Sequence, residues 1–141
     1  MRLWHKDLIP YLPRQQLLSQ YRECCCIAKS ISEKNTPNHI LVNKIMYYPI
    51  DHFYIYTSMV ADEMEKRGYK CNWDKFHKWL QKEVTCATID SLFKFWHNQR
   101  YLIQCYYNLQ EKYDCGGITD EEWQRIENKF GDICNGIYNR Q

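Results

Sequence analysis

The chain has 141 residues, enough for one domain with its own hydrophobic core, so neither disulfides nor a metal ion are needed for folding. No apolar run reaches about 18 residues, which argues against a transmembrane helix. No apolar segment follows the charged N-terminus, which argues against a secretory signal. Together these features predict a soluble, cytoplasmic protein. The net charge of +2 is unevenly distributed along the chain. Residues 1–100 hold 15 Lys and Arg against 10 Asp and Glu, whereas residues 101–141 hold 4 Lys and Arg against 7 Asp and Glu. A surface that binds an anionic partner should therefore come from the N-terminal two thirds of the chain.

Hydrophobic spacing and turn residues predict an all-α fold, a single compact domain of three main helices and a short C-terminal helix. Residues 1–12 read as an irregular lead-in that contains a proline. Pro13 suits the first turn of a helix that should run to about residue 29 or 32. A second helix is predicted over residues 49–67, because its apolar positions keep the helical spacing and Gly68 is a natural C-cap.

The second half of the chain is also predicted to be helical. Residues 40–48 fit either a short helix or an extended segment, and residues 72–80 fit a short helix rich in Trp and Phe. A long helix should cover about residues 88–113, and the Gly-Gly pair that follows should break it. Thr119 and Glu122 have the spacing of a capping box, which predicts a last helix that ends near residue 130.

The first predicted helix carries a polar stripe opposite its apolar face. One carboxylate, one guanidinium and several amides recur at helical spacing, so they share one side of the helix. The stripe consists of Gln15, Gln16, Ser19, Arg22, Glu23 and Cys26. Such a set suits contact with an anionic ligand, and the same spacing also fits an ordinary solvated helix face.

Residues 14–23 read Arg-Gln-Gln-Leu-Leu-Ser-Gln-Tyr-Arg-Glu and resemble the first helix of the pyrimidine-dimer DNA glycosylases, typified by phage endonuclease V. That family's pattern, Gln-x-Leu-x-x-x-Tyr-Arg-Glu, begins here at Gln15 and ends at Glu23. Residues 48–69 resemble the family's second helix with its Lys-Arg-Gly-aromatic ending, and residues 101–113 are similar more loosely. The C-terminal extension, about residues 115–141, is not covered by the resemblance.

The resemblance implies a DNA repair enzyme that is an N-glycosylase on pyrimidine dimers in UV-damaged DNA, with a linked abasic-site lyase activity. In that chemistry an amine attacks the sugar C1′, displaces the base and leaves an imine, and β-elimination then cuts the strand. An α-amino group suits this role, because its reference pKa of about 7.7–8.0 leaves much of it unprotonated near neutral pH. Aminopeptidases remove methionine poorly ahead of a large residue such as Arg2. We therefore expect Met1 to be retained and its α-amine to be the nucleophile.

The resemblance also implies roles for the polar stripe. Glu23 is expected to be the general acid/base and the anion that stabilises the cationic imine. Arg2 and Arg22 are expected to bind phosphates beside the lesion, and Gln15 to hydrogen-bond DNA near an extruded nucleotide. The phage enzyme has Arg where Cys26 stands, so we expect Arg14 or Lys29 to replace that charge. The predicted DNA contacts are Arg2, Arg14, Gln15, Gln16, Arg22 and Lys44.

Several aromatic residues have two possible interpretations. The aromatic, basic C-terminal loop of the phage enzyme has no clear counterpart in this sequence. Trp96-His97 or Tyr106-Tyr107 could replace it, or could lie in the core as most aromatics at helical spacing do. His5, close to the proposed amine, could contact DNA or pack on Trp4.

Two rival functions remain open from the sequence: a non-catalytic binder of distorted DNA with the same fold, and a redox sensor built on Cys24-Cys25-Cys26. The chain has eight cysteines. They form no Cys-x-x-Cys pair, and no Cys or His spacing matches a zinc site, so buried, reduced thiols are expected. We expect no metal, no cofactor and a monomer whose partner is double-stranded damaged DNA.

Overall fold

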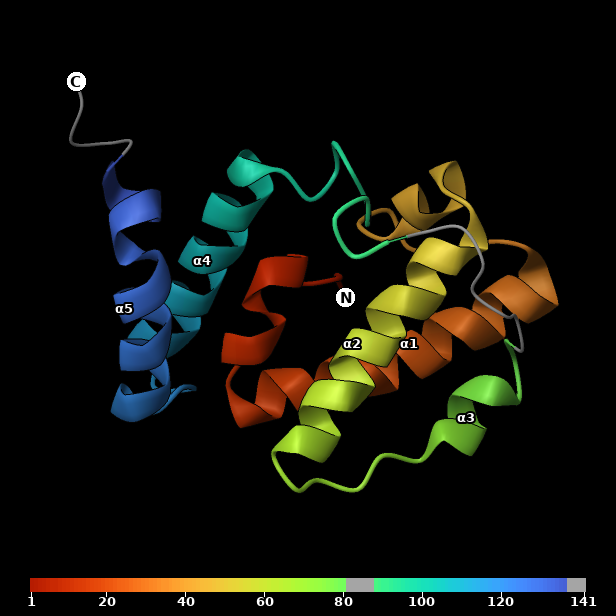
Figure 1. Ribbon diagram of the computed structural model, residues 1–141, viewed down its shortest axis with the longest axis horizontal. Helices are drawn as coiled ribbons and strands as arrows, with labels where there is room; N and C mark the ends of the chain where they lie inside the picture. Colours follow the sequence, from red (N-terminus) through yellow and green to blue (C-terminus); the bar gives the residue numbers. More distant parts are fainter. Residues whose placement is uncertain (81–87, 137–141) are drawn as a thin grey trace.

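Helices make up all the regular structure in residues 1–80 and 88–136, the part of the chain that the computed structural model describes. The elements are η1 (Lys6–Tyr11), α1 (Arg14–Lys34), η2 (Asn43–Tyr47), α2 (Ile50–Lys66), α3 (Trp73–His77), α4 (Gln99–Asp114) and α5 (Asp120–Gly136), where η denotes a 3-10 helix. α1 packs against α2, α4 packs against α5, and the N-terminal segment with η1 lies between the two pairs (Figure 1). The predicted all-α fold is confirmed.

The N-terminal segment was predicted to be irregular, but it turns into η1 and forms the centre of the core. Leu3, Leu8 and Leu12 are almost completely buried. The turn begins where the Asp7 backbone N–H donates to Nδ1 of His5 at 3.1 Å. η1 packs against α2 on one side and α5 on the other, so the start of the chain is enclosed by helices from both halves of the sequence.

α1 and α2 follow the predicted periodicity. α1 buries Leu17, Tyr21 and Cys24 at spacings of three and four residues. It ends at Asn35, which has the left-handed conformation (φ 58°), slightly later than predicted. α2 stops where the sequence indicates, because Gly68 has a φ of 84°, which costs glycine little.

The segment 88–98 contradicts the prediction of a helix that starts near residue 88. It folds into a series of turns, and α4 begins only at Gln99, where the Asn98 side chain accepts the Tyr101 backbone N–H at 2.9 Å. Phe93 and Phe95 have φ values of 49° and 74°, which a helix does not allow. The physical reason is tertiary: Phe93 is buried in the core, and its backbone N–H donates to Nδ1 of His52 at 3.0 Å.

α5 starts as predicted and is longer than predicted. The capping box is present, since the Glu122 backbone N–H donates to Thr119 Oγ1 at 3.2 Å and the Thr119 N–H donates to Glu122 Oε1 at 3.1 Å. The helix then runs to Gly136 rather than to about residue 130, so it is as long as α2, with 17 residues each. Its apolar face covers α4 and η1, and Phe130 packs edge-on against the ring of Tyr11.

The aromatic pairs considered for DNA contact lie mostly in the core. Trp96, His97 and Tyr106 are buried. His5 is buried as well and stacks on the His97 ring, with ring centroids 5.2 Å apart. His97 Nδ1 accepts the backbone N–H of Lys6 at 3.0 Å, so the two histidines tie the N-terminal segment to the start of α4 and do not form a DNA surface.

The buried His97 should make the protein sensitive to acid. Burial, followed by the nearby His5 and Lys6, lowers the pKa of His97 from 6.5 to about 2. Between these two pH values only the unfolded chain binds the proton. The free energy of unfolding should therefore fall below about pH 6.5, by up to about 1.4 kcal/mol for each pH unit. Urea unfolding at a series of pH values between 7.5 and 5 measures this slope.

The matched variant is His97→Asn, because an Asn Oδ1 can accept the Lys6 N–H without taking up a proton. It should unfold with a shallower pH slope than the parent protein. Some slope should remain, since burial also lowers the pKa of His5. Identical slopes in the two proteins would show that His97 does not carry the effect.

Candidate active site

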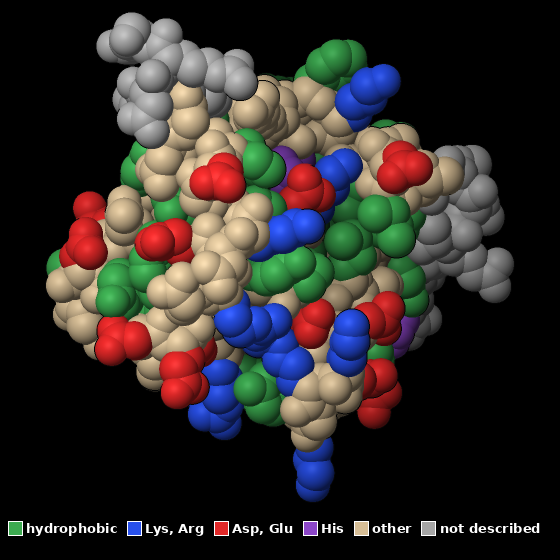
Figure 2. Space-filling view, turned by 60° about the vertical axis from the view of Figure 1, so that its left-hand side comes forward, with side chains coloured by type: hydrophobic (Ala, Val, Ile, Leu, Met, Phe, Trp, Pro, Cys, Tyr) green, Lys and Arg blue, Asp and Glu red, His purple; other side chains and the backbone are tan. Residues whose placement is uncertain are grey.

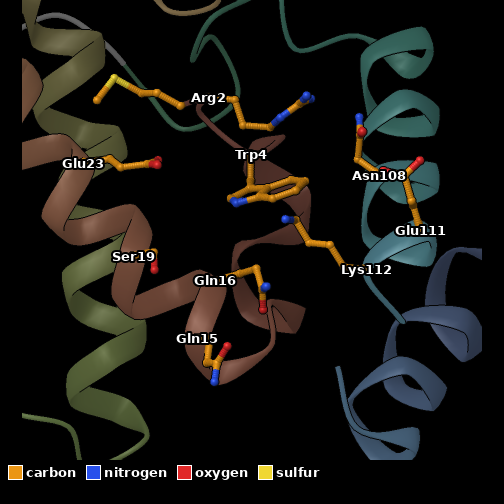
Figure 3. Close-up of a pocket in the computed structure, with 10 residues that line it drawn as sticks. Arg2, Trp4, Gln15, Gln16, Ser19, Glu23, Asn108, Glu111 and Lys112 are labelled. Atoms are coloured by element: carbon orange, nitrogen blue, oxygen red, sulfur yellow. The ribbon is translucent and has the colours of Figure 1, made fainter. Parts of the chain in front are cut away.

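A pocket of about 350 Å³ opens between the N-terminal segment, α1 and α4 (Figure 3). The N-terminal segment contributes Met1, Arg2 and Trp4, α1 contributes Gln15, Gln16, Ser19 and Glu23, and α4 contributes Asn108, Glu111 and Lys112. We call it the N-terminal pocket. Five of the residues predicted for the site therefore meet there: Met1, Arg2, Gln15, Gln16 and Glu23.

The α1 wall of the pocket follows from the periodicity of the helix. Gln15, Gln16, Ser19 and Glu23 stand on successive turns, so their side chains share one face. Glu23 is half-buried and points into the pocket (Figure 3). The Oε1 atom of Gln16 is buried without a hydrogen-bond partner among the described residues. The wall thus offers a ligand a carboxylate and holds one buried acceptor without a partner among the described residues.

Gln20 attaches the N-terminal segment to α1. Its side chain is completely buried, accepts the Trp4 backbone N–H at 2.8 Å through Oε1 and donates through Nε2 to the Arg2 carbonyl at 3.0 Å. The same Nε2 lies 3.4 Å from Oε2 of Glu23, also as a donor. One side chain therefore sets the position of the start of the chain relative to the carboxylate of the pocket.

Two tyrosines from other helices complete this attachment. The Tyr56 hydroxyl of α2 donates to the Trp4 carbonyl at 2.6 Å, and the Tyr101 hydroxyl of α4 donates to the Leu3 carbonyl at 2.6 Å. Burial raises the pKa of both phenols above their usual value, so the hydroxyls remain donors. The carbonyls of residues 2, 3 and 4 are each held by a different helix, while Met1 beyond them is 43% exposed.

Charged groups of both signs surround the N-terminal pocket. The Arg2 guanidinium lies over the Trp4 ring, 5.3 Å from its centroid. Lys112 reaches in from α4, and the carboxylates of Glu23 and Glu111 stand on opposite walls (Figure 3). This arrangement suits a substrate that carries an anionic group and develops positive charge nearby.

Three other predicted DNA contacts lie around the pocket instead of lining it. Arg22 is exposed and donates to Ser19 Oγ at 3.0 Å, which places it at the rim. Arg14 lies over the Tyr69 ring, 5.4 Å from the centroid. Lys44 lines a separate pocket that shares Arg2 with the first. Figure 2 shows Lys and Arg side chains gathered in the middle of one face, with Asp and Glu more frequent in its left-hand part.

The α4 wall and the role of Gln20 were not predicted from the sequence. Nothing in the sequence shows that residues 108–112 turn toward the N-terminus, because this depends on how the second half of the chain folds back. Gln20 did carry a signal: it lies three residues after Leu17 and four before Cys24, on the apolar face of its helix. A polar residue at such a position needs a buried partner.

Two of the three consecutive cysteines, Cys24 and Cys25, are poorly suited to redox sensing. All seven described cysteines are free. Burial raises the pKa of the Cys24 and Cys25 thiols, which lowers the fraction of reactive thiolate at neutral pH. Cys86 lies outside the described residues. Within residues 1–80 and 88–136, no group of three or more His, Cys, Asp or Glu side chains could hold a metal ion. No helix in the same ranges is long and apolar enough to cross a membrane.

Comparison with protein families shows that residues 1–77 match the family described as pyrimidine dimer DNA glycosylase. Comparison with curated proteins and with solved structures gives no significant match. The matched segment holds the N-terminal segment, the α1 wall and the Gln20 attachment, and it covers more than half of the 141 residues. This chain therefore belongs to the pyrimidine dimer DNA glycosylase family, whose members act in DNA repair.

Proposed function

We propose that the protein breaks the glycosidic bond of one pyrimidine of a dimer by attack of the Met1 α-amine on C1′, while that base stays joined to its partner in the dimer. The strand is then cut by β-elimination. The observation that carries the proposal is the N-terminal pocket, where the start of the chain and Glu23 are held together through Gln20. An amine nucleophile needs a nearby acid/base and a restricted position relative to the carbon that it attacks. The fixed carbonyls of residues 2 to 4 limit that motion.

The proposed reaction starts with the amine lone pair, which forms a bond to C1′ while the bond from C1′ to the pyrimidine nitrogen breaks. The departing base takes the bonding electron pair and a proton. The amine then loses a proton, and its lone pair forms the C1′–N double bond while the C1′–O4′ bond breaks. O4′ takes that bonding pair and a proton, so the sugar ring opens and a protonated imine joins the protein to C1′. Removal of a C2′ proton and departure of the 3′ phosphate cleave the strand. Glu23 is the acid/base for these transfers and the counter-charge of the imine.

The DNA contacts follow from the position of each cation. Arg2 in the pocket and Arg22 at its rim would bind phosphates on either side of the reacting sugar. Arg14 and Lys44 lie farther out and would bind the flanking backbone. Gln15 and Gln16 offer amide groups to the nucleotide that enters the pocket, and a damaged pair costs less to open than an intact one.

Borohydride reduction of a protein–DNA mixture tests the proposal, because it converts an imine into a stable covalent adduct. A duplex with a single thymine dimer should give an adduct whose attachment site maps to Met1 by mass spectrometry, and undamaged duplex should give none. An adduct on Lys112, the other amine of the pocket, would overturn the assignment to Met1. Binding of the dimer duplex without any adduct would favour a non-catalytic binder of distorted DNA.

A further inference from the structure

A second pocket, of about 190 Å³, adjoins the N-terminal pocket through Arg2. Two turns border it: the segment around η2 supplies Ile40, Leu41 and Lys44, and the segment before α4 supplies Phe95. Arg100 from the first turn of α4 also lines it. Three of its lining residues are cations and none is a carboxylate, so the pocket favours an anionic partner.

The same surface exposes large apolar side chains. Phe95 is 82% exposed, Ile40 83% and Leu41 48%. Exposed apolar groups beside cations are typical of a surface that binds both bases and phosphates. A cation also lies next to the Phe95 ring itself, since Lys94 Nζ is 5.6 Å from its centroid.

The fold holds Phe95 outward from a firmly anchored loop. Its neighbours Phe93 and Trp96 are buried, the Lys94 carbonyl accepts the Tyr48 hydroxyl at 2.5 Å, and the Phe95 carbonyl accepts from Asn98 Nδ2 at 2.9 Å. Phe95 nevertheless has a φ of 74°, which is unfavourable for any residue with a β-carbon. A strained backbone that directs an aromatic ring into solvent does not serve the core, which indicates a role in binding.

We propose that Phe95 is a wedge that inserts between base steps of the damaged duplex, with Lys44 and Arg100 on the flanking phosphates. Apolar side chains inserted in this way unstack a base step and kink the helix. Arg2 belongs to both pockets, so the kinked step would lie next to the nucleotide that enters the N-terminal pocket. In Figure 1 the segment that carries Phe95 leads into the start of α4, near η2 and beside the N-terminus. The proposal rests on the proposed function, because it assumes that damaged DNA is the ligand.

The sharpest test compares Phe95→Gly with Phe95→Tyr. Glycine accepts a φ of 74° without strain, so Phe95→Gly should melt at the same temperature as the parent or higher while it removes the ring. Its affinity for a duplex with one thymine dimer should fall by about 5- to 150-fold, the range for loss of one stacked aromatic. Phe95→Tyr keeps the ring and should bind like the parent. Ile133→Ala removes an exposed apolar side chain from α5 and should bind unchanged.

Two further readouts locate the contact on DNA. A 2-aminopurine next to the dimer should brighten when the parent protein binds, because the wedge unstacks it, and should stay quenched with Phe95→Gly. The logarithm of the affinity should fall with the logarithm of the salt concentration. Lys44→Ala and Arg100→Ala should each make this dependence shallower, by about 1 in the slope. Parent-like affinity and fluorescence with Phe95→Gly would overturn the wedge. Phe95-dependent binding to phosphatidylserine vesicles with unchanged DNA binding would assign the surface to a membrane instead.

The wedge and the chemistry can fail separately. If the parent forms a borohydride adduct while Phe95→Gly binds the dimer duplex equally well, the wedge is wrong and the proposed reaction stands. If Phe95→Gly loses affinity while the parent forms no adduct on any duplex, the wedge stands and the proposed reaction is wrong.

Discussion

Glu23→Gln should lower the rate of dimer-dependent strand cleavage by about 10²- to 10⁴-fold, the usual contribution of a general acid/base. Gln keeps the size of the side chain, and its Oε1 can still accept from Gln20 Nε2, as Oε2 of Glu23 does at 3.4 Å. Folding should therefore be preserved. Single-turnover incision of a dimer duplex and anisotropy titration of the same duplex measure the two effects. The rate of strand cleavage should fall strongly. The affinity for the dimer duplex should change little or rise, since a negative charge has been removed.

Glu33→Gln provides the matched control. Glu33 is an exposed carboxylate near the other end of α1, and it does not line the N-terminal pocket. The variant makes the same change in net charge and should cleave at the parental rate. If Glu23→Gln also cleaved at the parental rate, Glu23 would have no part in the chemistry. The second carboxylate of the pocket, Glu111, would then be the next candidate.

Gln20→Leu should damage both stability and chemistry, although Gln20 touches no substrate. The substitution keeps the volume approximately but leaves the Trp4 N–H without its partner and removes the bond to the Arg2 carbonyl. Leaving buried groups unpaired costs about 1–3 kcal/mol each, so a loss of roughly 2–6 kcal/mol in the free energy of unfolding is expected for the two groups. Urea unfolding measures it. A start of the chain that is misplaced by about 1 Å should also lower kcat by about 100-fold.

Two comparisons separate positioning from simple loss of folding. Tyr56→Phe removes the hydroxyl that donates to the Trp4 carbonyl and to Gln20 Oε1. Like Gln20→Leu, it should lower kcat, and it leaves the charge of the pocket unchanged. Gln124→Leu alters an exposed glutamine of α5 and should leave both quantities unchanged. A Gln20→Leu protein that is folded at the assay temperature and cleaves as fast as the parent would show that the attachment is not needed.

Local sequence patterns were sufficient to predict α1, α2, the start of α5 and the α1 side of the site. Helical hydrogen bonds are local, so the 3.6-residue period places Gln15, Gln16 and Glu23 on one face in the structure as it does in the sequence. Local signals also fixed the end of α2 at Gly68 and the start of α5 at Thr119. The family resemblance was carried by this same N-terminal half.

The other walls of the site depend on contacts between distant parts of the chain. Residues 88–98 have helical spacing of apolar residues, yet contacts of Phe93 with the core override it and turn Phe95 into solvent. The α4 wall of the N-terminal pocket and the bond from Tyr101 to Leu3 join residues about a hundred positions apart. Such contacts depend on how the two helix pairs close around the N-terminal segment. No local sequence pattern predicts how the helix pairs pack, because the free energy of that packing comes from burying surfaces that meet only in the folded chain.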